Sequence, residues 1–282
     1  MGEIFIGTEA VASNAVTRYE LARWYRPMFP NVHGPKGRAL TLRDRAIGAW
    51  LWSKRRGIIT GLAASALHGA DWVDADIPIE LIHNSAHPPK GIVAHNERIA
   101  EDEIQCVQGV LVTTPARTAF DLGRYHPRGP ALARLDALMR ATAYSDEDVM
   151  LMAKRYRGAR GLKMLKQLLP LVDGGAASPR ESWLRLLYID AGLPKPRTQI
   201  PIFDEFGNIL RTVDMGWEEF KVVSEYDGDQ HRTLRWQYVK DQRVIPKLER
   251  LGWFVSRVIK EDLPAEIIQR AWDAMAARGW RP

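Results

Sequence analysis

The chain has 282 residues, of which 46% are hydrophobic and 26% charged, a composition typical of globular protein and a length sufficient for about two domains. No segment approaches the roughly eighteen uninterrupted apolar residues of a membrane span, and the start MGEIFIGTEA lacks the features of a secretion signal, so we expect a cytoplasmic protein with no membrane partner. The lone Cys106 excludes an intrachain disulfide and a thiolate zinc cage, whereas metal sites built from oxygen ligands stay open.

Basic residues are concentrated in the N-terminal part. The chain holds 40 Lys and Arg against 34 Asp and Glu, and residues 1–177 hold 23 of the basic and 18 of the acidic residues. This part therefore carries +5 of the formal net charge of +6. A modest surplus of this kind suits a polyanionic partner such as DNA without proving it.

Residues 1–57 are predicted to form a winged-helix-like segment. Thr17 and Glu20 have the spacing of a capping box, which predicts a short helix over 20–25, and the prolines and glycines of 29–37 end it. Apolar spacing returns over 41–57 and predicts a second helix. The run Lys54, Arg55 and Arg56 is a candidate phosphate contact, with a solvated surface as the alternative.

Residues 58–150 are predicted to form a small mixed α/β domain. Apolar runs and alternating patterns predict a helix over 60–69, strands over 77–82 and 91–99, a hairpin over 104–113, and helices over 114–122, 131–141 and 145–157. Thr114 is expected to cap its helix, with Pro115 at the first helical position. Residues 151–177 are read as a basic helical linker, and its cations as a solvated face rather than a phosphate-tracking stripe.

Residues 178–282 are predicted to form a second domain with the element order αβββαβα. The patterns indicate helices over 178–192, 233–252 and 264–279 and strands over 198–203, 209–217, 220–228 and 252–259. Pro246 is expected to bend or interrupt its helix. The fold class expected for the whole chain is therefore α+β.

Acidic residues of this second domain fall on two neighbouring strands. Glu225 and Asp227 are two positions apart and share one face of their strand, and a neighbouring strand can bring Asp214 alongside. Burying several carboxylates together is costly unless a cation or a proton compensates them. The pattern therefore predicts a hard divalent cation, Mg²⁺ or Mn²⁺, which can activate water for phosphodiester hydrolysis.

The element order αβββαβ, the three carboxylates and the run SEYDGDQHR resemble the PD-(D/E)XK nuclease superfamily, and more closely the Vsr-like domains related to very-short-patch repair endonucleases. The resemblance implies a restriction-endonuclease-like core in which Asp214, Glu225 and the Tyr226 carbonyl bind metal and Glu181 assists catalysis. It also places Asp227, Gln230 and His231 in the catalytic site.

Asp227 stands where the lysine of that motif would be, so His231 is the nearest candidate for a general base. Glu181 also has the spacing of a capping box with Ser178, and capping and catalysis remain equally open. Lys240 and Arg243, in the run KDQR, are further candidate nucleic-acid contacts.

The runs ITGLAASALHGADW and GVLVTTPARTAFDL resemble the AbiEi-type antitoxin and transcriptional-regulator family, in which a winged-helix module precedes an α+β domain. We expect a metal-dependent endonuclease that hydrolyses DNA phosphodiester bonds, delivered by a basic N-terminal region that binds DNA or a partner toxin. The alternative is a non-enzymatic, AbiEi-like DNA-binding regulator or antitoxin with a degenerate nuclease domain. A nuclease acting on RNA is a third possibility.

Overall fold

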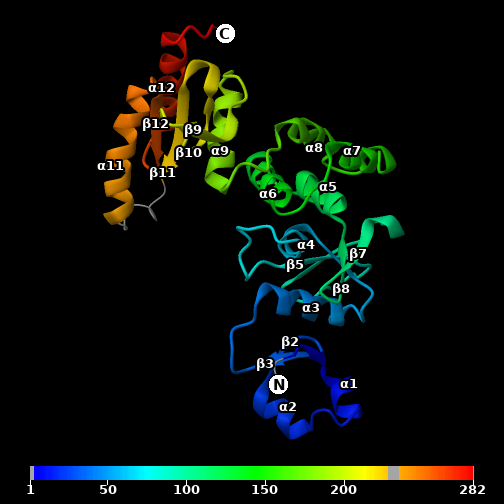
Figure 1. Cartoon of the computed structure of the whole chain (residues 1–282). Helices are drawn as coiled ribbons and strands as arrows, with labels where there is room; N and C mark the ends of the chain where they lie inside the picture. The colour runs from blue at the N-terminus through cyan, green and yellow to red at the C-terminus, as the bar shows by residue number, and fades with distance from the viewer. Residues whose placement is uncertain (1–2, 228–234, 282) are drawn as a thin grey trace. The chain divides into compact units, whose positions relative to one another are not determined.

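The computed structural model describes residues 3–227 and 235–281, with only the backbone described for residues 235–242. Helices and strands occur in both halves of the chain, as the α+β expectation required. The chain divides into two compact units, Met1–Val172 and Asp173–Pro282, and each is described by itself (Figure 1).

The first unit begins with a small module of three strands and two helices. Its elements are β1 (Phe5–Ile6), α1 (Gly7–Ala12), α2 (Arg18–Trp24), β2 (Tyr25–Phe29) and β3 (Val32–Pro35). The capping box of Thr17 and Glu20 is confirmed, because Thr17 accepts from the Glu20 amide at 3.2 Å and the Glu20 carboxylate accepts from the Thr17 amide at 2.8 Å.

The proline-rich run that was expected only to break the helix forms an antiparallel hairpin instead. The strands lie in the order β1-β3-β2, so β2 is an edge strand and tolerates the missing amide proton of Pro27. Asn31 takes the turn with a φ of 62°, a conformation that asparagine adopts more readily than most residues.

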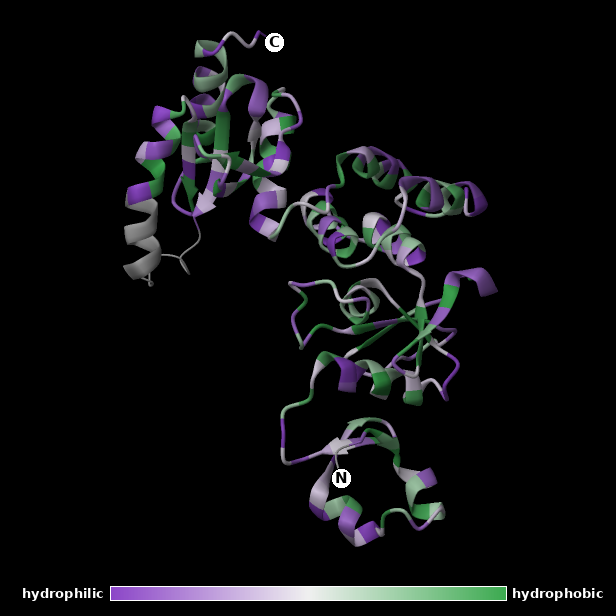
Figure 2. Cartoon of the chain, viewed as in Figure 1, coloured by the Kyte–Doolittle hydropathy of each residue, from purple (hydrophilic) through white to green (hydrophobic). Residues whose placement is uncertain are grey.

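A five-stranded sheet forms the centre of the first unit. Its elements are α3 (Leu42–Trp52), β4 (Ile58–Thr60), α4 (Gly61–Leu67), β5 (Ile79–Ile82), β6 (Ile92–His95), a short 3-10 turn η1 (Glu101–Glu103), β7 (Ile104–Val107) and β8 (Val110–Thr113). The strand order is β6-β5-β4-β8-β7, with β4 parallel to β8. Ile59, Leu81 and Val112 are fully buried, and their strands are largely green in Figure 2.

Helices complete the first unit after the sheet. They are α5 (Pro115–Tyr125), α6 (Arg128–Ala141), α7 (Asp146–Arg155), α8 (Leu162–Leu168) and the 3-10 turn η2 (Leu169–Leu171). Thr114 caps α5 and Pro115 opens it, as predicted. The segment expected to be a linker is packed, because Leu165 and Leu168 of α8 are fully buried.

The second unit has the predicted order of elements. They are α9 (Pro179–Asp190), β9 (Arg197–Phe203), β10 (Ile209–Trp217), the 3-10 turn η3 (Glu218–Phe220), β11 (Val222–Asp227), α11 (Arg235–Arg250), β12 (Phe254–Ile259) and α12 (Pro264–Ala277). The sheet order is β12-β11-β10-β9, in which only the β11–β12 pair is parallel among the described strands.

Pro246 does not interrupt its helix, contrary to the sequence-based expectation. α11 continues from Arg235 to Arg250 with Pro246 inside it. Val244 and Leu248 on either side of the proline are buried against Ile200, Val213 and Val223 of the sheet. Packing of this apolar face offsets the hydrogen bond that proline removes.

Candidate functional site

The second unit brings Asp214 near two other carboxylates that the sequence singled out, Glu181 and Glu225. Asp214 lies on β10 and Glu225 on β11, and the two strands pair so that Met215 faces Ser224. Burial first, and then the nearby charges of Glu181 and Glu225, raise the pKa of Asp214 to about 7, against a hydrogen bond from the Tyr226 amide at 2.8 Å that lowers it. Asp214 is therefore a carboxyl group that holds its proton more tightly than usual.

Arginines compensate the other carboxylates. Arg211 contacts Glu225 through Nε at 2.5 Å and a terminal nitrogen at 2.9 Å, and Arg257 contacts Asp227 at 2.6 Å. Among the described residues, no group of three or more His, Cys, Asp and Glu side chains is arranged to hold a metal ion. Guanidinium groups thus balance the charges of Glu225 and Asp227, and the divalent-cation site stays a prediction.

Glu181 has the capping geometry that its spacing allowed. Its amide donates to Ser178 Oγ at 3.2 Å, its Oε1 accepts from that hydroxyl at 2.9 Å, and its Oε2 accepts from the Ala177 amide at 2.8 Å. Glu181 is 8% exposed, at the first turn of α9. Tyr226, the third expected metal ligand, places its ring edge-on to Trp183 with centroids 6.5 Å apart.

The remaining candidates are scattered or lie outside the described residues. Gln230 and His231 lie within 228–234, outside the described residues. Lys240 lies in the part of α11 for which only the backbone is described. Arg243, further along α11, is exposed. Lys54, Arg55 and Arg56 are exposed at the end of α3, and Lys54 and Arg55 have positive φ angles of 56° and 62°. Arg55 forms a bidentate pair with Glu9 at 2.9 and 2.6 Å, so this candidate phosphate contact already binds a carboxylate.

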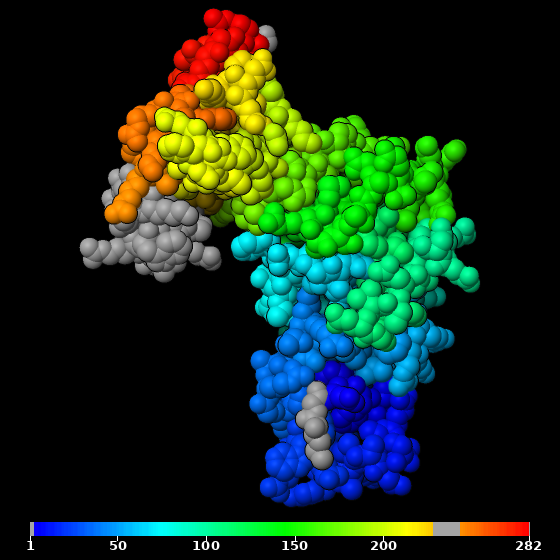
Figure 3. Space-filling view, viewed as in Figure 1, coloured from blue at the N-terminus to red at the C-terminus, as the bar shows by residue number. Residues whose placement is uncertain are grey.

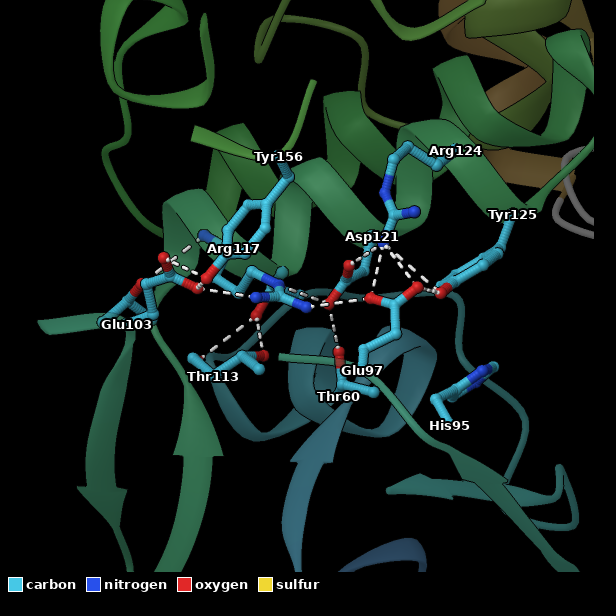
Figure 4. A network of polar contacts seen from close by, with 12 residues as sticks. Thr60, His95, Glu97, Glu103, Thr113, Arg117, Asp121, Arg124, Tyr125 and Tyr156 are labelled. Carbon is cyan, nitrogen blue, oxygen red and sulfur yellow. Dashed lines mark hydrogen bonds and ion pairs between the residues drawn. The ribbon is translucent and has the colours of Figure 1, made fainter. Parts of the chain in front are cut away.

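A buried polar network lies at the start of α5, where the run TTPARTAFDL leaves β8 (Figure 4). Arg117 is 1% exposed and contacts three carboxylates: Glu103 at 2.6 Å, Asp121 at 3.0 Å and Glu97 at 3.0 Å. Thr60 at the end of β4 donates to Asp121 at 2.7 Å. The network therefore ties α5 to the central sheet and to the segment before β7.

A second buried arginine extends this network. Arg124 contacts Asp121 at 2.8 Å and Glu97 at 2.9 Å, and the Tyr125 hydroxyl donates to Glu97. The pKa of Tyr125 is raised, first by burial and then by that hydrogen bond to Glu97. Each of the carboxylates named in Figure 4 has a cationic partner, an arrangement suited to holding the domain together.

Sequence reasoning assigned TTPART to a capped helix start and missed the network. The spacing of Arg117 and Asp121, four residues apart on one helix, was the available signal. Glu97 and Glu103 carry no such signal, because they come from a segment whose position depends on the tertiary fold.

The N-terminal module presents an exposed, cationic helix. No residue of α2 is buried; Tyr19 is 66% and Trp24 is 54% exposed. The Arg23 guanidinium lies over both rings, 5.0 Å from the Trp24 centroid and 5.7 Å from the Tyr19 centroid. Residues 1–57 hold ten basic and four acidic side chains.

Residues 55–171 match the family described as the AbiEi antitoxin C-terminal domain. Two uncharacterized proteins of Mycobacterium tuberculosis, from strains CDC 1551 / Oshkosh and ATCC 25618 / H37Rv, are each 33% identical over 205 residues, covering 72% of this chain and 74% of theirs. The chain belongs to their family and contains a domain that matches the AbiEi antitoxin C-terminal domain. This domain contains the buried network of Arg117 and Arg124. No solved structure matches the chain significantly.

The expected endonuclease function is wrong. The AbiEi antitoxin domain match points to a regulator or antitoxin, and nothing in the comparisons supports a PD-(D/E)XK or Vsr-like nuclease. Glu225 has a cationic partner within the fold, because it pairs with Arg211. The Mg²⁺ or Mn²⁺ site is not tested by the comparisons.

No helix in the described part of the chain is long and apolar enough to cross a membrane.

Proposed function

We propose that this chain is a non-enzymatic DNA-binding regulator of the AbiEi antitoxin type. The observation that carries the proposal is the match of residues 55–171 to the antitoxin domain, directly preceded by a small cationic module. A cognate toxin is the proposed second partner, which rests on the family description alone. In this proposal the second unit keeps an endonuclease-like order of elements as a scaffold without cleavage.

The order of parts in the N-terminal module supports the proposal that it is a winged helix. A strand, two short helices and a hairpin follow one another, and β1 pairs with β3 at the centre of the sheet. In such a module the second helix enters the major groove and the hairpin lies beside it. The corresponding elements here are α2 and the β2–β3 hairpin, within the blue part of Figure 3.

The side chains of α2 suit this role. Arg18 and Arg23 are exposed and can bind phosphates or guanine edges, while Tyr19 and Trp24 offer apolar contact. Glu20, the helix's acidic residue, is engaged at the N-terminus by Thr17. The helix therefore offers positive charge and aromatic surface where a duplex would lie.

Binding of the full chain to labelled duplexes tests the proposal. The substrates are the DNA upstream of the chain's own gene and a random duplex of equal length, each titrated at several salt concentrations. We expect R18Q/R23Q to weaken binding and to reduce the slope of log K against log salt by about 2, because each lost phosphate contact removes about 0.9 from the slope.

The matched control is K90Q/K260Q, which removes two exposed lysines, one in each unit. Its affinity for the duplexes and its salt slope should be close to those of the unaltered chain. Equal affinities and equal salt slopes for R18Q/R23Q and this control would refute a DNA-binding role of α2.

A further inference from the structure

A cavity of about 370 Å³ lies in the first unit beside the buried network. Its walls come from three parts of the unit. Glu97 and Arg98 follow β6, Arg155 ends α7, Tyr156 to Ala159 form the turn between α7 and α8, and Phe120 belongs to α5. The cavity is distant in sequence from the N-terminal module, and none of its lining residues belongs to that module.

The surroundings of this cavity are cationic. Residues 149–172 contain six basic and no acidic side chains. Those exposed on α7, the following turn and α8 are Lys154, Arg155, Arg157, Arg160, Lys163 and Lys166. Residues 150–166, which are green in Figure 3, lie at the molecular surface.

The acidic groups near the cavity are already paired. Glu97 contacts Arg117 and Arg124, at 3.0 and 2.9 Å. Arg155 contacts Asp102 at 2.8 Å and the buried Glu103 at 2.5 Å. Because these carboxylates are neutralised within the fold, the exposed Arg98 and Arg157 give the cavity rim its positive charge.

An oriented aromatic ring forms part of the wall. The Tyr156 hydroxyl donates to Glu103, with its oxygen 2.8 and 2.9 Å from the two carboxylate oxygens, and the Arg117 guanidinium lies 5.0 Å from its ring centroid. These contacts hold the ring in one place. Glu97 is 30% exposed at its side chain, so its carboxylate can still accept from a ligand hydroxyl or amine.

We propose that this cavity binds a phosphate-bearing nucleotide unit. Arg98 and Arg157 contact the phosphate, Tyr156 lies against the base, and Glu97 accepts from the sugar or the base edge. Positive charge interleaved with an aromatic ring is the arrangement by which proteins hold single strands of nucleic acid. The nucleotide can be free or part of a strand, and the cations of α8 extend the site for the phosphates of a strand.

Calorimetry with AMP and with inorganic phosphate, and fluorescence anisotropy with a labelled single-stranded oligonucleotide, test the proposal on the full chain. We expect AMP to bind more tightly than phosphate. R98Q/R157Q should lower the affinities for AMP and for the oligonucleotide by about tenfold or more, because the variant removes charged hydrogen-bond donors to the phosphate.

K163Q/K166Q separates the two sources of the nucleotide. These lysines lie on α8 and do not line the cavity. If a strand is the ligand, this variant weakens oligonucleotide binding several-fold and leaves AMP binding unchanged. If a free nucleotide is the ligand, AMP binds as tightly as the oligonucleotide, and K163Q/K166Q changes neither affinity.

The proposal is overturned if R98Q/R157Q binds AMP and the oligonucleotide as K90Q/K260Q does, or if phosphate binds as tightly as AMP. Both positions of R98Q/R157Q are exposed, so the variant should fold, and an unchanged thermal midpoint verifies this. R18Q/R23Q should leave AMP binding intact. The result for α2 and the result for the cavity are therefore independent of one another.

Discussion

Arg211 and Glu225 form a bidentate ion pair between β10 and β11, with Nε 2.5 Å from Oε1 and a terminal nitrogen 2.9 Å from Oε2. Glu225 is 6% exposed, so the pair is largely shielded from water. Bidentate arginine–carboxylate pairs are among the stronger charge-assisted contacts in proteins. A divalent cation that binds Glu225 would therefore compete with the guanidinium for the carboxylate oxygens.

Arg211→Met should make the protein more responsive to Mg²⁺. The substitution leaves Glu225 near Glu181 and Asp214 without this compensating charge. In EDTA we expect a lower thermal midpoint than for the unaltered chain, and a larger rise on adding Mg²⁺. The double variant R211M/D214N should respond less than R211M. Equal Mg²⁺ shifts for the unaltered chain and R211M would show that the guanidinium does not compete with a cation.

Asp214→Asn should stabilise the second unit at neutral and higher pH. The pKa of Asp214 is about 7 in the folded chain against 3.8 for the ordinary group, so the folded state binds the proton more tightly. Its stabilising contribution is present below about pH 4 and is lost as the pH rises to about 7. We expect the variant's free energy of unfolding to exceed that of the unaltered chain by about 2–4 kcal/mol at pH 8.

This gain should be largely lost near pH 4, where Asp214 is protonated in the folded state and close to half protonated in the unfolded state. Denaturant unfolding at pH 4, 6 and 8 measures the difference. The exposed Asp273→Asn is the control for removal of one carboxylate from the same unit. A gain at pH 8 that is no larger for Asp214 than for Asp273 would contradict the role given to burial.

The imidazole of His95 should titrate at higher pH than that of His68. Its hydrogen bond to Glu80, at 2.8 Å, raises the pKa of His95 above 6.5, whereas burial lowers the pKa of His68. The stabilising contribution of His95 is therefore present below pH 6.5 and is lost as the pH rises through its folded value. NMR titration of the imidazole signals measures the order, and Glu80→Gln should lower the midpoint of His95 and leave that of His68 unchanged. The reverse order would show that burial outweighs the ion pair.

Arg117→Met should destabilise the first unit by about 3 kcal/mol or more, because removing one partner leaves buried carboxylates uncompensated. Glu103 and Asp121 are 0% and 1% exposed, although Arg155 and Arg124 still contact them. Denaturant unfolding measures the loss. The exposed Arg98→Met is the control, expected within about 0.5 kcal/mol of the unaltered chain. A similar small loss for Arg117→Met would mean that the network contributes little net stability.

Gly61→Ala should cost more stability than Gly109→Ala. Both glycines have positive φ angles, 61° and 88°, so both substitutions strain the backbone by about 1–2 kcal/mol. At Gly61 an added Cβ would lie 2.3 Å from Glu80 Oε1, whereas at Gly109 it would meet no atom within 4 Å. The thermal midpoint of G61A should therefore be the lower one, and equal midpoints would show that Glu80 moves aside without loss.

Local sequence signals predicted much of the second unit. The order αβββαβα was correct because its strands and helices have clear periods and end at recognisable turns. Helix caps such as Thr17, Thr114 and Ser178 were also readable, since each bonds to residues within one turn. The hairpin of β2 and β3 was missed because prolines usually break strands, and only an edge position accommodates Pro27.

The candidate site was harder to predict for a physical reason. The sequence places Asp214 and Glu225 on neighbouring strands correctly, but the partner that balances them, Arg211, is recognised only in three dimensions. The same holds for Glu97 and Glu103, which meet Arg117 across long stretches of chain. Charge pairing over such separations leaves no periodic pattern, so the sequence indicated the acidic residues but not the arginines that pair with them.

Ile59 of β4 pairs in parallel with Val112 of β8, so the central strand of the first unit lacks one neighbour until residues 110–113 have been synthesised. The strands of the N-terminal module, in contrast, pair within the first 35 residues. Closing a long loop before its contacts form slows folding. During translation we therefore expect the module that carries α2 to acquire its pairing first, while the antitoxin domain forms only after β8 leaves the ribosome.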